Sequence, residues 1–341
     1  MDSLLDIEQP ALLLNYLRDR GVIGTNEAIT ARALMGGVSN RTVLVERPGG
    51  DAWVVKQALA KLRVAADWFS SPERIHREAA GLRWLESLAP PGTTTRLVFE
   101  DHQHHILAME AVPQPHTNWK SDLLAGQVEP DQIEQFGALI GTVHRNASLR
   151  RAEVEPVFAD QQFFESLRVE PYYRYTAEQL PESAGFFQEL IAATRARRLT
   201  LVHGDYSPKN ILVHSGRLVL LDHEVIHFGD PAFDLGFSLT HLLSKGHYVS
   251  QRRNLFADAA VHYWAAYASE IDQCDWRADL ERHVCMHTLG CLLARVSGRS
   301  PLEYLDQQQR QRQRVATLRL MRRPLATVRA LIDAFIELVT A

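Results

Sequence analysis

Two nearby segments, "HGDYSPKN" (203–210) and "LLDHE" (220–224), hold side chains able to do chemistry together. Their hard oxygen donors are the carboxylates of Asp205, Asp222 and Glu224 and the amide of Asn210. Such oxygens suit Mg²⁺, which usually keeps waters and phosphate oxygens as further ligands. Zinc would need Cys or His at short spacing, and the nearby histidines do not complete such a set. A polar loop capped by its own side chains is the alternative, but it does not require four oxygen donors.

The chain between these segments predicts a β-hairpin. Two short apolar runs, 211–213 and 218–221, flank a turn that contains Gly216. The first residue of one strand then faces the last residue of the other. Asn210 and Asp222 are therefore expected at the same open end, about 5 Å apart.

A second group of candidate residues lies near the N-terminus, in a β-rich region. "GGVSN" (36–40) stands between two β-forming runs, where its glycines could expose backbone N–H groups to phosphates. Lys56 ends the strand "WVVK", and Glu78 borders the apolar face of the following helix, near the sheet. Each feature alone has an ordinary structural explanation. Together and in this order, they favour nucleotide binding, with Glu78 holding Lys56 as a phosphate clamp.

The elements that must position these residues form two parts. Residues 28–112 read as antiparallel strands with one helix, which starts after a serine cap and Pro72 and stops at "PPG". From Asp131 onward the pattern is mostly helical, with later helices expected over 236–244, 251–269, 278–297 and 301–319. The prediction is an α+β fold with an N-terminal lobe over 1–112, including a leading amphipathic helix, and a C-terminal helical lobe over 113–341.

This order of motifs resembles the protein-kinase-like superfamily, and its motifs look like those of the aminoglycoside phosphotransferase and choline kinase branch. "HGDYSPKN" matches that branch's HGDxxxxN, "LLDHE" stands in place of DFG, and "FGDPAFDLG" is similar to its GDPxxDLA-like segment. "VVKQALAKLRVAADWFSSPERIHREAAGL" is similar to the KQAL…R…W…ER…E pattern of methylthioribose kinases. The resemblance covers about residues 30–300 and implies a protein-kinase-like bilobal fold.

The resemblance also implies a role for each candidate residue in an ATP- and Mg²⁺-dependent kinase of a small hydroxylated metabolite. Asp205 would orient the acceptor hydroxyl, and Asn210, Asp222 and Glu224 would hold or surround Mg²⁺. Lys56 would bind phosphates with Glu78 fixing it, and Asp234 and His203 would order the catalytic loop. The expected phosphate cover is Gly36, Gly37, Ser39 and Asn40, and the expected adenine-reading strand is Met109, Glu110 and Ala111.

The acceptor is less well defined by the sequence. Methylthioribose kinases usually carry HGDxHTGS and DPEF segments where this chain has "HGDYSPKN" and "DHEV". A related kinase with another acceptor is therefore expected, with a sugar, an amino alcohol or an aminoglycoside as further classes. Arg295 and Arg299 are candidate substrate residues, because arginine suits paired oxygens. A nucleotide-binding pseudokinase scaffold is the alternative, and a protein kinase is disfavoured because no APE-like segment follows Asp222.

Composition excludes several other classes of protein. The formal net charge is −4 and the pI about 6.4, so neither nucleic acid nor an anionic membrane is an expected partner. Three widely spaced cysteines favour a reducing cytoplasm over a disulfide framework, and no apolar run is long enough to span a bilayer. A monomer or homodimer is expected.

Two biased segments are expected to be ordinary surface features. "HQHH" (102–105) is predicted to be an exposed hairpin tip with no further ligands nearby, and "DQQQRQRQR" (306–314) is predicted to be a solvated helix face.

Overall fold

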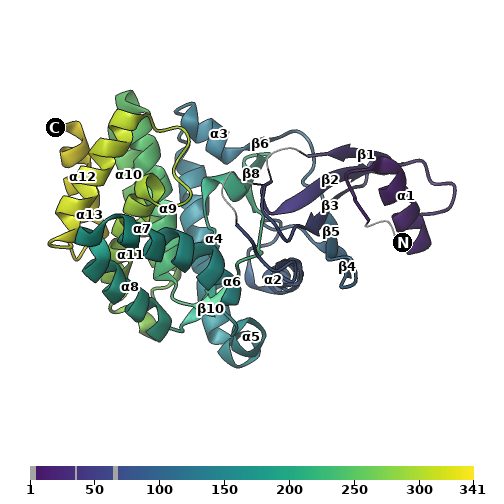
Figure 1. The fold of residues 1–341 in the computed structure, drawn as a ribbon, viewed down its shortest axis with the longest axis horizontal. Coiled ribbons are helices and arrows are strands. Elements are labelled where there is room, and N and C mark those ends of the chain that lie inside the picture. Colours follow the sequence, from purple (N-terminus) through teal and green to yellow (C-terminus); the bar gives the residue numbers. More distant parts are fainter. Residues whose placement is uncertain (1–4, 35–36, 64–67) are drawn as a thin grey trace.

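The N-terminal part of the chain is built on one antiparallel sheet (Figure 1). The structure is a computed structural model that describes residues 5–34, 37–63 and 68–341, so Gly36 lies outside the described residues. The sheet has the order β1-β2-β3-β5-β4. Its strands are β1 (Thr30–Ala33), β2 (Asn40–Glu46), β3 (Ala52–Ala58), β4 (Leu97–Asp101) and β5 (Ile106–Glu110). The successive antiparallel strands expected from the sequence are confirmed.

A helix packs on each face of this sheet. Side chains of a strand alternate between its two faces, so β3 turns Val55 toward α1 (Pro10–Asp19) and Ala58 toward α2 (Arg74–Leu88). Lys56 shares its face with Ala58, and it therefore points toward α2. This alternation is what brings the lysine to the functional site.

Helix α2 differs in one detail from its prediction. It begins at Arg74, and the predicted serine cap is a turn just before the helix, in which Ser71 Oγ accepts a hydrogen bond from the Glu73 N–H at 3.3 Å. The apolar face expected from the sequence is buried, including Ile75 and Leu82. The helix ends at Leu88, just before Pro90 and Pro91, which cannot donate backbone hydrogen bonds to continue it.

The remainder of the chain is mainly helical and contains two small sheets (Figure 1). Its α-helices are α3 (Trp119–Leu124), α4 (Pro130–Leu149), α5 (Arg151–Phe158), α6 (Gln162–Phe164), α7 (Tyr175–Gln179), α8 (Ala184–Ala196), α9 (Ala232–Tyr248), α10 (Arg253–Glu270), α11 (Leu280–Ser297), α12 (Gln307–Met321) and α13 (Val328–Thr340). A π-helix, η1 (Glu165–Arg174), and four short 3₁₀ turns complete the helical segments. The strands are β6 (His116–Asn118), β7 (Thr200–Val202), β8 (Ile211–His214), β9 (Arg217–Leu220) and β10 (His227–Gly229).

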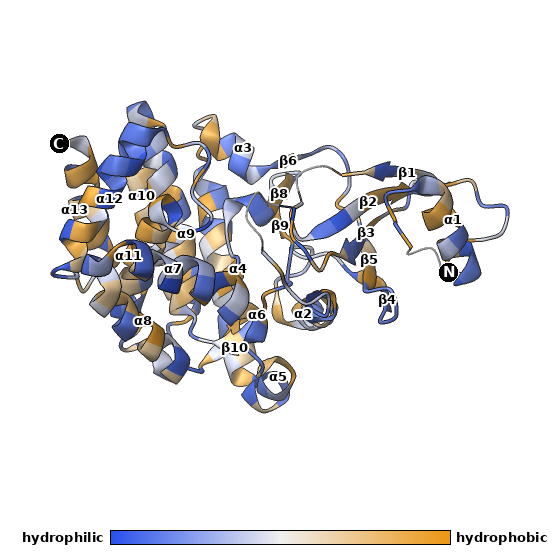
Figure 2. Cartoon of the chain, viewed as in Figure 1, coloured by the Kyte–Doolittle hydropathy of each residue, from blue (hydrophilic) through white to orange (hydrophobic). Residues whose placement is uncertain are grey.

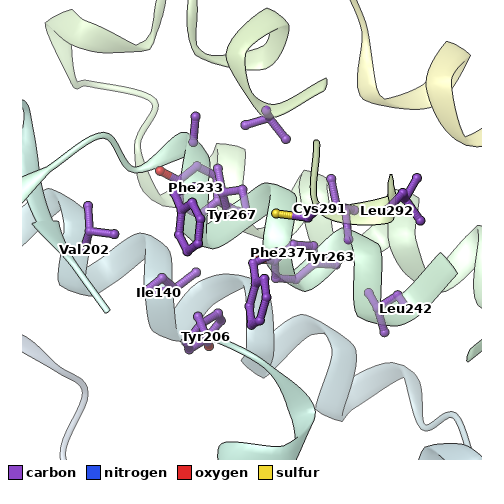
Figure 3. Packing of buried hydrophobic residues seen from close by; sticks show 14 of the residues in the cluster. Ile140, Val202, Tyr206, Phe233, Phe237, Leu242, Tyr263, Tyr267, Cys291 and Leu292 are labelled. Carbon is purple, nitrogen blue, oxygen red and sulfur yellow. The ribbon is translucent and has the colours of Figure 1, made fainter. Parts of the chain in front are cut away.

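Aromatic and aliphatic side chains from α4, α9, α10 and α11 fill the core of the helical part. Figure 3 shows Phe233 and Phe237 at its centre, with Tyr206 of the segment "HGDYSPKN" packed into the same cluster. The Tyr206 ring stacks on the Phe136 ring, with ring centres 4.3 Å apart, and the Tyr206 hydroxyl donates to the Phe136 carbonyl at 2.7 Å. The residue next to Asp205 is thereby anchored in the core.

The helix expected over 301–319 starts later than the sequence suggested, so that boundary was wrong. Residues 301–306 are not helical, and α12 begins at Gln307. Asp306 caps the helix, because its carboxylate accepts from the Gln309 N–H while the Gln309 side chain bonds back to the Asp306 N–H.

In Figure 2, α12 carries long hydrophilic stretches, whereas α13 is hydrophobic over most of its length. No helix among the described residues is long and apolar enough to cross a membrane.

Candidate active site

The hairpin predicted between the two motifs is present and closes as expected. Ser215 and Gly216 form its two-residue turn, with φ values of 50° and 76° that match the twist of the flanking strands. At the open end, the Leu221 N–H donates to the Asn210 carbonyl at 2.9 Å. Asn210 and Asp222 therefore lie at the same end of the hairpin, as the sequence indicated.

Asp205 is buried next to that end and is surrounded by positive charge. Its Oδ2 lies 3.1 Å from Arg168 Nη2 and 2.9 Å from Lys209 Nζ, and it accepts a hydrogen bond from Asn210 Nδ2 at 2.8 Å. Burial alone would raise the pKa of Asp205, but the charges of Arg168 and Lys209 outweigh it and lower the pKa. Asp205 Oδ1 has no hydrogen-bond partner among the described residues. This buried oxygen is thus an unpaired acceptor within the site.

The backbone of the loop that carries Asp205 is fixed by Asp234 and His203. The Asp234 carboxylate accepts from the N–H groups of His203 and Gly204 at 2.7 and 2.8 Å, and His203 Nδ1 accepts from the Asp205 N–H at 3.2 Å. Gly204 has φ +76°, and a Cβ there would lie 2.9 Å from the Val225 carbonyl oxygen. Only glycine fits this position without a shift of the loop.

Lys56 joins the sheet, α2 and the hairpin exit at one point. Its Nζ lies 2.6 Å from Glu78 Oε1 and 3.1 Å from Asp222 Oδ1. Burial alone would lower the pKa of Lys56, but the charges of Asp222 and Glu78 outweigh it and raise the pKa. Burial raises the pKa of Glu78 to about 7, although the ammonium group of Lys56 pulls it down. Carboxylates thus outnumber the ammonium group here, which is an environment that favours a divalent cation.

Glu224 lies beside this cluster, but its side chain is already bonded within the protein. Its Oε2 accepts from Arg74 Nε at 3.1 Å and from Asn40 Nδ2 at 3.3 Å. Arg74 is fully buried and also donates to the carbonyl groups of Ser39 and Leu59. Glu224 therefore connects the glycine-containing segment to the start of α2.

No role was expected from the sequence for Arg74, Arg168 or Lys209. Arg74 lies within the "ER" of the methylthioribose-kinase-like pattern, and Lys209 within "HGDYSPKN", so a signal existed for both. Arg168 lies in the π-helix, far from the motif in sequence, and no spacing rule connects it to Asp205.

The two other groups of expected nucleotide contacts are the phosphate cover and the adenine-reading strand. They differ in how many of their polar groups are already bonded within the protein. Gly37 is exposed, whereas Ser39 and Asn40 are buried and tied to Arg74 and Glu224. The backbone N–H groups of Glu110 and Ala111 already donate to the carbonyl oxygens of Arg96 and Ala52, both at 2.9 Å. The Met109 side chain is buried against α2, in the cluster that contains Ile75 and Leu82.

Of the two arginines expected at the acceptor side, the structure brings one toward Asp205. Arg295 is buried and donates to the Tyr172 hydroxyl at 3.3 Å; the guanidinium groups of Arg295 and Arg168 lie 5.6 and 5.8 Å from the Tyr172 ring centre. Arg295 is thus linked to Asp205 through Tyr172 and Arg168. Arg299 is exposed over the Tyr175 ring and has no such link among the described residues.

Lys245 of α9 is a further buried amine near Arg295. It lies 5.4 Å from the Tyr304 ring centre and makes a long hydrogen bond of 3.5 Å to the His241 carbonyl. Burial lowers the pKa of Lys245 to about 7, and the charges of Lys120 and Arg295 act in the same direction. His241 Nε2, Arg295 Nε and Tyr304 Oη are buried and have no partner among the described residues.

Comparison with known proteins places the chain in a family. The sequence model of the phosphotransferase enzyme family matches residues 30–276, which is well over half of the chain. The chain belongs to this family. The chain is 26% identical to the methylthioribose kinase of Yersinia pseudotuberculosis serotype O:3 (strain YPIII) over 257 residues, which cover 67% of this chain and 63% of that protein. The chain thus spans less than two thirds of the length of the curated relatives it matches.

Solved structures with low sequence identity share the fold of this chain. An ethanolamine kinase of Plasmodium vivax has a TM-score of 0.55 at 11% identity, with 97% of this chain and 87% of that chain covered. An amicoumacin kinase in complex with AMP-PNP and Ca²⁺ has a TM-score of 0.54 at 13% identity, with 92% and 95% covered. The expected kinase-like fold, with an antiparallel-sheet N-terminal region and a mostly helical remainder, is confirmed.

Proposed function

We propose that this protein is an ATP-dependent kinase that transfers the γ-phosphate to a hydroxyl group of a small molecule. The observation that carries the proposal is that Lys56 and Asp222, from the two parts of the chain, meet at 3.1 Å beside the exit of the hairpin that also carries Asn210. Family membership and the methylthioribose kinase relatives support a phosphotransferase of small molecules. The amicoumacin kinase complex, with its nucleotide analogue and divalent ion, supports a nucleotide and a metal as cofactors.

The site offers ligands that suit Mg²⁺. We assign Asn210 and Asp222 to the ion, because they provide an amide and a carboxylate oxygen at one hairpin end. Burial and the like charge of nearby Asp222 raise the pKa of Glu224. Its bonds to Arg74 and Asn40 favour a positioning role over direct ligation. When bound, Mg²⁺ neutralises charge on the phosphates that are being transferred.

The protein's own residues position the reactants, which is the main task in phosphoryl transfer. Lys56 would contact the α- and β-phosphates, and Glu78 would hold the lysine in place. Asp205, kept ionised by Arg168 and Lys209, would accept a hydrogen bond from the acceptor hydroxyl through its free Oδ1 and align it with the γ-phosphate. Its lowered pKa fits this aligning role better than early proton removal, because a weak base gains little by taking a proton before the bond forms.

The positive groups beyond Asp205 restrict the acceptor. The guanidinium groups of Arg168 and Arg295 would repel a cationic acceptor, so the site disfavours aminoglycosides and amino alcohols. We infer an acceptor that is neutral or carries an anionic group, which Arg295 and Lys245 would stabilise.

The experiment that tests the proposed function is ADP release with Mg²⁺ and ATP across matched acceptor pairs. Each pair contains a neutral or anionic polyol and a cationic amino analogue, such as glucitol or gluconate against glucosamine. Turnover is expected with neutral or anionic members. Asp205→Asn should lower kcat about a hundredfold or more while MgATP still binds, as measured by calorimetry.

Asp333→Asn, which changes an exposed carboxylate on α13, is the matched control and should keep full activity. Near-normal turnover in Asp205→Asn would refute the assignment. Nucleotide binding without turnover of any acceptor would favour the pseudokinase scaffold instead.

A further inference from the structure

The hairpin tip "HQHH" (102–105) meets the start of α2, and candidate metal ligands gather there. The turn lies between β4 and β5 as the sequence indicated, but the expectation that no further ligands lie nearby is wrong. His105 Nδ1 lies 3.3 Å from His76 Nε2 and 3.8 Å from Glu73 Oε1. These residues are near in space because α2 begins beside the β4–β5 turn.

We propose that Glu73, His76 and His105 form a binding site for a divalent transition-metal ion such as Zn²⁺. Two nitrogens that each lie 2.0–2.1 Å from a tetrahedral zinc ion are about 3.3 to 3.4 Å apart, and the His76 and His105 nitrogens have this separation. Glu73 Oε2 lies 4.0 Å from His76 Nε2, and the Glu73 side chain is 61% exposed. A side-chain rotation that brings this oxygen about 0.6 to 0.7 Å closer would complete three protein ligands of types that zinc accepts.

A carboxylate behind His76 prepares its ring for metal binding. Glu100 Oε1 lies 2.6 Å from His76 Nδ1, and Arg83 holds Glu100 from its other side. An ionised carboxylate can only accept a hydrogen bond, so the ring proton belongs on Nδ1 and the lone pair on Nε2. That lone pair is directed toward His105. Metal-binding histidines usually have a carboxylate or carbonyl acceptor in this position.

A second set of ligands, His76, Glu100 and His102, fits an ion less well. The 2.6 Å between His76 Nδ1 and Glu100 Oε1 is a hydrogen-bond length, and it is shorter than the spacing of about 3.3 Å between two ligands of one tetrahedral ion. His102 is 74% exposed and stacks on the face of His76, with ring centres 3.9 Å apart. His102 is therefore excluded from the proposed site and serves as its natural control.

The ligand types separate this site from the proposed Mg²⁺ site. Imidazole nitrogens suit zinc, nickel and copper, whereas Mg²⁺ requires oxygen ligands. The ion would join the β4–β5 turn to α2, two residues before Glu78, which holds Lys56. Metal binding to the folded protein would therefore stabilise the region that carries the phosphate clamp.

The test is calorimetric titration of the full chain with Zn²⁺ in the presence of excess Mg²⁺, which fills the oxygen-rich site. One zinc site is expected. His105→Asn and Glu73→Gln should each weaken it about tenfold or more, and both should reduce the rise in melting temperature that zinc causes. His105 has φ +49°, a conformation that asparagine also tolerates, so His105→Asn keeps the turn. His102→Ala is the matched control and should bind zinc as the unaltered protein does.

Three results would overturn the proposal. They are the absence of zinc binding in the unaltered protein, unchanged binding in Glu73→Gln and His105→Asn, and loss of binding in His102→Ala. Because Glu73 is exposed, Glu73→Gln tests the site without risk to folding. The readouts are binding and melting temperature, so they do not depend on the proposed kinase activity.

Discussion

Single residues set the charge of the proposed catalytic carboxylate. Asp205 is buried, which alone would favour its neutral form, yet Arg168 and Lys209 keep it ionised. The spacing of "HGDYSPKN" allowed Asp205 and Asn210 to be predicted from the sequence. Arg168, which lowers the pKa of Asp205, could not be predicted, because tertiary packing of a π-helix makes the contact and no local pattern indicates it.

Arg168→Gln is expected to shift the acid side of the pH–activity profile to higher pH. Asp205 must be ionised to accept the hydrogen bond of the hydroxyl, so activity falls as the pH drops through its pKa. Removing the Arg168 charge raises that pKa, since burial then has less opposition. The measurement is kcat/KM against pH for the variant and the unaltered protein.

Arg329→Gln is the matched control for this prediction, because Arg329 is an exposed arginine on α13 with no proposed role in the site. Its profile should coincide with that of the unaltered protein. An Arg168→Gln profile whose acid limb stays in place would show that Arg168 does not set the charge of Asp205.

At the scale of elements, close packing of α2 on the hairpin exit brings Glu78 to Lys56 and Asp222. Gly81 of α2 makes this approach possible, since a Cβ there would lie 2.8 Å from His223 Cβ and 3.2 Å from Ile226 Cγ2. The apolar face of α2 and the strand alternation of β3 were readable from the sequence. The contact through Gly81 was not, because a glycine inside a helical pattern does not reveal which segment approaches it.

Gly81→Ala is expected to lower kcat/KM for ATP by about tenfold while changing the melting temperature little. The added methyl group forces α2 away from His223 and loosens the Lys56–Glu78 contact of 2.6 Å. The higher helix propensity of alanine, worth about 1 kcal/mol, offsets part of the lost packing. Initial rates and thermal unfolding, measured on the same preparations, test whether kcat/KM falls while the melting temperature stays nearly unchanged.

A matched control for this change is Gly185→Ala in α8, where a Cβ meets nothing within 4 Å. It should leave kcat/KM unchanged. Equal activity of Gly81→Ala and Gly185→Ala would show that the tight approach of α2 does not matter for the site.

For the whole molecule, the sheet part and the helical part are connected at the site by charges that a ligand would rearrange. Lys56 of the sheet part bonds Asp222 of the helical part at 3.1 Å, and Asn40 and Arg74 bond Glu224 across the same junction. The sequence predicted the two parts and several of these residues, because each motif has a local pattern. It could not predict which carboxylate pairs with which cation, since the pairing depends on how the two parts pack.

Magnesium and nucleotide are therefore expected to stabilise the folded chain together. Asp222 lies beside Lys56 and Glu78, so a nucleotide without Mg²⁺ would bring negative charge close to two carboxylates and bind weakly. At a hundred times the dissociation constant, ADP with Mg²⁺ should stabilise the fold by about 2.7 kcal/mol. Asp222→Asn should remove most of the Mg²⁺ dependence, whereas Asp333→Asn should keep it. Thermal unfolding with ADP, with and without Mg²⁺, is the measurement, and an equal rise in melting temperature under both conditions would contradict the proposed metal role of Asp222.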